Sequence, residues 1–283
     1  VRTPEDFGLQ GAWPTHPELL DTLAVDFRES GWDVHALLKR IVLSATYRQD
    51  SAFRPDLHEL DPDNELLARY PSRRLWAEQI RDQALYHAGL LVEQTGGPSV
   101  KPYQPAGLWR EVAMPASNTR EFVRGSGDDL YRRSLYTYWK RAAPPPAMRA
   151  FDAPTREFCT VQRATTDTPL QALVLWNDEQ FVEAARVLAQ RTLSREGTDE
   201  TRLGRLFRRC TAQEPDERER AVLSETLDAF RQRFSASPGD ASSLLRVGDA
   251  MVPETMAGAE PELAAWTMVA STVMNLYRVT TQE

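Results

Sequence analysis

The stretch of residues 130–178 constrains the fold most, because it combines a run rich in aromatic residues with the clearest helix start in the chain. Residues 130–139 contain no Gly or Pro, and their aromatic content favours a strand over a helix. The prolines at 144–146 cannot continue a hydrogen-bonded ladder and predict a stiff, extended connector. Thr168 and Gln171 flank a Pro at the first helical position, as in a capping box. We therefore expect a helix to begin at Thr168.

Apolar periodicity predicts helices on both sides of this stretch. The expected helices cover residues 19–27, 33–42, 62–67, 75–94, 170–193 with a break at Asp178, 201–210, 215–234 and 260–277. Within the stretch, residues 148–151 predict a single helical turn and 155–163 a short strand or extended segment. The predicted fold class is mainly α, with multi-helical layers and a small β element near residues 130–163.

Three sub-layers follow from this pattern: a helical one over residues 1–112, a loop and β element over 113–178, and a helical one over 179–283. We expect them to form a single domain. The chain starts with Val1 and has no signal peptide, so the sequence predicts a fragment of a longer protein.

Composition and charge favour some classes of function over others. The formal net charge of -7 argues against a general nucleic-acid-binding role, because phosphate binding relies on a basic surface. No apolar run approaches the roughly 20 residues of a membrane-spanning helix. Cys159 and Cys210 match no metal or redox spacing. They are interpreted either as two separate buried thiols or as one disulfide.

The segment after the prolines holds the best candidates for catalysis, namely Asp152, Arg156, Glu157 and Arg163. The two acids could act as a base, as ligands or as ion-pair partners for arginines. A buried ion-pair network that locks this segment to the helix at Thr168 explains the same residues without catalysis. The chain lacks the common nucleophile, phosphate-loop, metal and dinucleotide motifs, so no reaction follows from the sequence.

Aromatic and basic residues suggest a second kind of site, one that binds a ligand. Aromatic rings and planar polar groups stack on and hydrogen-bond to sugars or a partner protein. The candidate binding residues are Trp109, Arg132, Tyr136, Tyr138 and Trp139. The alternative is a core aromatic layer.

One further set of charged side chains lies on the helix predicted over residues 75–94. Glu78, Arg81 and Asp82 are expected to form a solvated charged face of this helix, with a cleft lining as the alternative.

Several motifs together resemble one family. They are R-T-P-E-D-F-G at residues 2–8, L-S-A-T-Y-R-Q at 43–49, G-G-P-S-V-K-P-Y-Q-P at 96–105, L-Y-R-R-S-L-Y-T-Y-W-K-R at 130–141, F-D-A-P-T-R-E at 151–157, T-P-L-Q-A-L-V-L-W-N-D at 168–178 and A-A-W-T-M-V-A-S-T-V-M-N-L at 264–276. This combination resembles the planctomycete PSD1 family, also called the DUF1553 domain.

The resemblance implies an exported protein, periplasmic or on the cell surface, in which this domain follows a DUF1549 domain and often a c-type cytochrome domain. The chain has no haem-attachment motif, so we expect no cofactor here and any haem in the missing N-terminal part. We expect a binding or assembly module near a redox module. Its expected partners are the DUF1549 domain and a carbohydrate or a protein. The alternative is an extracytoplasmic enzyme that acts on polysaccharide.

Overall fold

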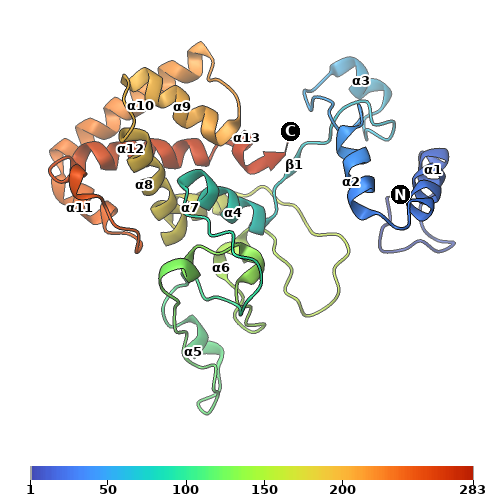
Figure 1. Cartoon of the computed structure of the whole chain (residues 1–283), viewed down its shortest axis with the longest axis horizontal. Helices are drawn as coiled ribbons and strands as arrows, with labels where there is room; N and C mark the ends of the chain where they lie inside the picture. The colour runs from blue at the N-terminus through green and yellow to red at the C-terminus, as the bar shows by residue number, and fades with distance from the viewer. Residues whose placement is uncertain (1, 283) are drawn as a thin grey trace. The chain divides into compact units, whose positions relative to one another are not determined.

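The structure is a computed structural model that describes residues 2–282, and it is mainly helical as the sequence predicts (Figure 1). The chain divides into two compact units. Unit 1 comprises Val1–Arg73, Cys159–Arg163 and Thr281–Glu283, and unit 2 comprises Arg74–Phe158 and Ala164–Thr280. Among the described residues, no helix has both the length and the apolar character needed to span a bilayer.

The described residues of unit 1 form the helices α1 (Pro17–Glu29), α2 (Val34–Leu43) and α3 (Pro55–Leu60). Helices α1 and α2 confirm two of the expected helices. At the start of α2, the Asp33 side chain accepts a hydrogen bond of 3.0 Å from the backbone N–H of Ala36, as expected of a cap. The helix predicted over residues 62–67 is wrong. The Asp61 carboxylate instead accepts hydrogen bonds of 2.8 Å from the backbone N–H groups of Glu65 and Leu66, which stabilises a turn there.

Unit 2 contains most of the helices. These are α4 (Ala77–Ala88), α5 (Leu108–Val112), α6 (Pro146–Ala150), α7 (Pro169–Asn177), α8 (Glu179–Leu193), α9 (Asp199–Thr211), α10 (Glu217–Ala236), α11 (Pro238–Leu245), α12 (Glu260–Met274) and α13 (Tyr277–Thr280), with the 3-10 turns η1 (Gly127–Leu130), η2 (Ser134–Tyr136) and η3 (Glu254–Met256). The strands β1 (Arg73–Arg74) and β2 (Thr281–Gln282) pair in a small two-stranded sheet.

Helix α12 forms the centre of the core of unit 2 and packs against α8, α10 and α11 (Figure 1). Its buried side chains surround the helix axis, which is typical of a helix enclosed on all sides. Trp266 and Val269 are fully buried. The core helix expected over residues 260–277 is therefore confirmed, although it ends at Met274 and a short α13 follows.

Local capping signals fix where α7 and α8 begin. The backbone N–H of Thr168 donates to Oε1 of Gln171 at 3.2 Å, and the Asp178 carboxylate accepts from the backbone N–H of Gln180 at 3.1 Å. Both predicted starts are confirmed. Gln171 is fully buried and also donates through Nε2 to the carbonyl of Ala150 at 3.0 Å, which connects α7 to the end of α6.

The end of α4 differs from the prediction. The helix was predicted to end near residue 94, but its last residue is Ala88. Gly89 caps it with a φ of 74°, in the left-handed region. The backbone N–H of Leu90 donates to the carbonyl of Leu85 at 2.8 Å, the bond that closes a Schellman motif. Leu90 follows the apolar pattern of the helix while lying outside it, so periodicity alone extends the helix too far.

The β element differs in place. Residues 130–139 form turns with isolated bridges, Val92 to Arg132 and Val100 to Thr137, and residues 155–163 form no strand. The Arg81 guanidinium donates hydrogen bonds to the carbonyls of Leu130 and Arg132 at 2.8 and 2.9 Å. The carbonyl of Leu130 also accepts from Nε2 of Gln180 at 2.8 Å, so both of its lone pairs are engaged and it is not available to a neighbouring strand.

The two cysteines are free thiols, so the disulfide alternative is wrong. Cys210 is buried as expected, whereas Cys159 is exposed, so the interpretation as two buried thiols is wrong for Cys159. Burial raises the pKa of the Cys210 thiol to about 12, which keeps it protonated and unreactive near neutral pH.

Candidate functional site

Asp152, the first of the predicted catalytic residues, is held in a turn after α6. Its φ of 59° is unusual for a residue with a side chain. Its Oδ2 accepts hydrogen bonds from the backbone N–H and the hydroxyl of Thr166, at 2.7 and 2.8 Å. The Thr166 hydroxyl also accepts from Nε2 of Gln171 at 3.2 Å. The carboxylate thus connects the turn after α6 to the start of α7.

The other three candidates are not gathered around Asp152 within unit 2. The Arg156 guanidinium stacks over the ring of Trp139, 4.6 Å from its centroid. Glu157 is exposed. Arg163 belongs to unit 1, whereas Asp152 and Glu157 belong to unit 2. A catalytic role for these four residues stays a prediction.

The predicted binding residues pack largely against each other. Trp109 is buried, and its ring lies 5.6 Å from that of Tyr138, with the Lys140 ammonium 4.7 Å from its centroid. Half-buried Trp139 donates through Nε1 to the carbonyl of Thr155 at 3.2 Å. Rings engaged in this way stabilise a loop layer and present little free face to a ligand.

Arg132 and Tyr136 form the second half of this set. The buried Arg132 guanidinium lies 4.0 Å from the ring centroid of Tyr136 and donates to the carbonyls of Gln94 and Pro98 at 3.0 and 3.1 Å. The Tyr136 hydroxyl accepts from the backbone N–H of Gly96 at 2.8 Å. Both side chains thus hold the loop after α4. A ligand-binding role stays a prediction.

Arg81 lies at the centre of a buried polar network that the sequence did not predict. Its Nε donates to Oε1 of Gln180 at 2.5 Å and its Nη1 donates to the Ser134 hydroxyl at 3.1 Å. Asp82 accepts from the backbone N–H and hydroxyl of Ser134 at 2.7 and 2.6 Å. Burial lowers the pKa of Arg81 to about 10. The expected solvated face is therefore wrong for Arg81.

A second buried network surrounds Glu183 on α8. Its Oε1 accepts from the hydroxyls of Tyr131 and Tyr103 at 2.9 and 3.2 Å and from the backbone N–H of Ala250 at 2.6 Å. The fully buried Arg186 lies 3.8 Å from the same oxygen and donates to the carbonyl of Ala250 at 2.6 Å. These contacts tie α8 to three loops that are distant in sequence.

The two phenols of this network stay protonated. Burial, opposed in part by the backbone N–H of Asp249, raises the pKa of Tyr103 to about 12. Burial, followed by the charge of Glu183, raises the pKa of Tyr131. Both hydroxyls therefore serve as donors to Glu183 over the physiological pH range. In the sequence, the only indication of this buried network is the i, i+3 spacing of Glu183 and Arg186 within an apolar stretch of α8.

Within residues 2–282, no group of three or more His, Cys, Asp or Glu side chains is placed to hold a metal ion.

Unit 1 shows a different feature, an apolar face with no covering layer. Neither α1 nor α2 has a buried residue. The apolar side chains of α2 repeat at helical spacing on one side, at Val34, Leu38, Ile41 and Val42, and are 54%, 53%, 37% and 42% exposed. We call these four residues the α2 stripe. An amphipathic helix normally buries such a stripe.

Comparison with known proteins identifies a family. The model of the PSD1 family, described as a protein of unknown function (DUF1553), matches residues 1–227. The chain belongs to the PSD1 family. No curated protein and no solved structure is significantly similar to it.

The PSD1 match covers the α2 stripe, the Arg81 network and the α8 side chains of the Glu183 network, whereas Ala250 lies beyond it; the match ends at residue 227, within α10. Helix α12 lies beyond the matched residues, although it packs against α8 and α10. The core of unit 2 therefore combines PSD1-matched helices with helices from the rest of the chain.

Proposed function

We propose that this PSD1 domain is an assembly module of an exported multidomain protein, and that the α2 stripe is its docking surface. The α2 stripe is the observation that carries the proposal. Each of the four side chains is roughly half exposed, and burying the rest of such a side chain contributes about 1 kcal/mol. The stripe thus offers about 4 kcal/mol to a partner before the cost of association.

The chemistry around the stripe supports a protein partner. The helix α1 carries Glu18, Asp21 and Glu29, and α2 carries Lys39 and Arg40, so the two helices bear charged side chains of both signs. An apolar centre with a charged rim is typical of protein interfaces. The resemblance to PSD1 proteins points to the DUF1549 domain of the same protein as the partner, with a cytochrome domain as a redox neighbour that would carry the haem.

The enzymatic alternative has less geometric support. The Asp152 carboxylate accepts two hydrogen bonds from Thr166, whereas the Glu157 side chain is exposed and its backbone N–H donates to the Thr155 hydroxyl at 3.4 Å. A retaining or inverting glycosidase needs two carboxyl groups that face one bond of the substrate.

The test is binding between this chain and the DUF1549 domain of the same protein, prepared as separate polypeptides and measured by calorimetry. Leu38→Gln on the α2 stripe is the test variant. Lys39→Gln on the same helix introduces the same side chain off the stripe and is the matched control. We expect Leu38→Gln to weaken binding about tenfold, which corresponds to about 1.4 kcal/mol. Equal affinities for both variants, or no binding by the unaltered chain, would refute the proposal.

A further inference from the structure

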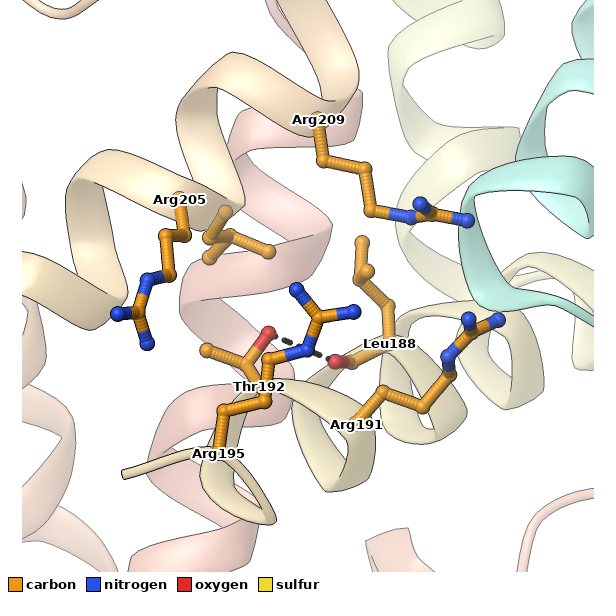
Figure 2. A pocket seen from close by; sticks show the side chains of 7 residues that line it. Leu188, Arg191, Thr192, Arg195, Arg205 and Arg209 are labelled. Carbon is orange, nitrogen blue, oxygen red and sulfur yellow. Dashed lines mark hydrogen bonds between the residues drawn. The ribbon is translucent and has the colours of Figure 1, made fainter. Parts of the chain in front are cut away.

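A pocket between the end of α8 and the middle of α9 is lined by four arginines. Arg191 and Arg195 come from the end of α8 and the residues that follow it, and Arg205 and Arg209 come from α9. The other lining residues are Leu188, Thr192 and Leu206, so the pocket lining contains no carboxylate. The pocket is a surface depression that is open to solvent on one side. Figure 2 shows Arg195 reaching between Arg205 on one side and Arg191 and Arg209 on the other.

The four guanidinium groups have no carboxylate partner among the described residues. Arg191 donates to the carbonyl of Ala88 at 2.9 Å, and Arg209 donates to the carbonyls of His87 and Tyr86 at 2.6 and 3.0 Å. Arg205 donates to the carbonyl of Glu196 at 2.7 Å.

These contacts compensate little of the positive charge. The carbonyls of residues 86–88 end α4, and that of residue 196 follows the end of α8. A helix C-terminus carries roughly half an elementary negative charge. The end of α4 therefore supplies about half an elementary charge, and the carbonyl of Glu196 adds a single peptide dipole, against four guanidinium charges.

Arg195 is the most informative of the four. Among residues 2–282 its guanidinium makes no hydrogen bond, ion pair or ring contact. The pKa of Arg191 is lowered by burial and further by the charges of Arg209 and Arg195. Like charges that lie this close together are stabilised by an anion placed between them.

Arg191, Arg205 and Arg209 are held in place by these hydrogen bonds before any ligand arrives. Arg205 and Arg209 are one helical turn apart on α9, so they lie on one face. Gly89 has a φ of 74°, and a Cβ at this position would lie 1.4 Å from Nη1 of Arg191. The absence of a side chain at Gly89 thus lets Arg191 reach the end of α4.

We propose that this pocket binds a phosphate or sulfate group. A tetrahedral oxyanion offers several acceptor oxygens to the fork of each guanidinium, and bidentate pairs of this kind are strong. A group with two negative charges also offsets more of the positive charge of the four guanidinium groups than a monovalent anion does. The group is either a free inorganic ion or an ester on a larger molecule, and the pocket recognises the feature that they share. This inference does not depend on the docking surface of unit 1.

The test is calorimetric titration of the full chain with sodium phosphate, sodium sulfate and methyl phosphate at constant ionic strength, with sodium chloride as the reference salt. Arg195→Gln is the test variant, because the Arg195 side chain has no partner whose loss would disturb the fold. Arg218→Gln is the matched control: Arg218 is exposed on α10 and does not line the pocket. Circular dichroism confirms that both variants remain folded.

We expect saturable binding of phosphate and sulfate at one site, weakened about tenfold or more by Arg195→Gln and unchanged by Arg218→Gln. Methyl phosphate that binds within a few-fold of inorganic phosphate supports an ester as the natural ligand, and much weaker binding supports the free ion. The proposal is overturned if phosphate binds no better than chloride, or if the two variants bind phosphate equally.

Discussion

His87 makes the stability of unit 2 depend on pH. It lies near the end of α4, is 7% exposed, and lines a small cavity with Ile80 and Leu175. Neither of its ring nitrogens has a hydrogen-bond partner among the described residues. Burial, and secondarily the charge of Arg209, lowers its pKa from 6.5 to about 4. The ring is therefore buried in its neutral form.

The sign and size of the effect follow from this pKa. Between pH 6.5 and 4 the unfolded chain binds a proton at His87 that the folded chain does not, so stability falls as the pH falls. The full loss is about 3 kcal/mol below pH 4, since each pKa unit corresponds to about 1.4 kcal/mol. At pH 5 about 2 kcal/mol is already lost.

The assay is urea unfolding at pH 8, 7, 6 and 5 for the unaltered chain and for His87→Leu. Leucine leaves no polar partner unsatisfied, because the ring nitrogens have none. We expect the variant to be at least as stable at pH 8, and to gain about 2 kcal/mol over the unaltered chain by pH 5. His58→Leu, at an exposed histidine on α3, is the control and should show a constant difference. A difference between His87→Leu and the unaltered chain that does not change with pH would refute the reasoning.

Three further substitutions test the buried networks by urea unfolding at pH 8. Gly248→Ala should lower the free energy of unfolding by about 3 kcal/mol or more, because Gly248 has a φ of 82° and an added Cβ would lie 2.4 Å from Cδ of Glu183. A loss below about 1 kcal/mol would contradict this close packing. Tyr131→Phe should cost about 2 kcal/mol through the lost hydrogen bond to Glu183, and no cost would show that this bond is not formed. Gln171→Leu should lower the free energy of unfolding by about 3 kcal/mol, because it leaves the Ala150 carbonyl and the Thr168 N–H unpaired. An unchanged unfolding midpoint would show that α7 does not depend on this side chain.

Features that depend on neighbouring residues could be predicted from the sequence. The starts of α7 and α8 follow from Thr168 and Asp178, whose capping bonds span two or three residues. The overall helical class follows from apolar periodicity in the same way. The end of α4 was predicted too late, because Leu90 continues the apolar pattern while its backbone closes the turn after Gly89.

Features that depend on distant residues could not be predicted. Residues 130–139 have the composition of a strand, but Arg81 and Asp82, about 50 positions earlier, occupy their backbone groups. Glu183 meets Tyr103 at a separation of 80 residues and Ala250 at 67. The arginine pocket likewise forms only when α8, α9 and the end of α4 pack together. No local pattern reports such contacts.

Thiol labelling tests most directly the proposal that a DUF1549 domain covers the α2 stripe. Leu38→Cys and the control Lys39→Cys are made in a Cys159→Ser background, because Cys159 is exposed while Cys210 is buried. Each is labelled in this chain alone and in a longer protein that joins this chain to the proposed DUF1549 partner. We expect the longer protein to slow labelling of Leu38→Cys by about a hundredfold, an opening free energy of about 3 kcal/mol, and to leave Lys39→Cys unchanged. Equal labelling of Leu38→Cys in the two proteins would contradict the account.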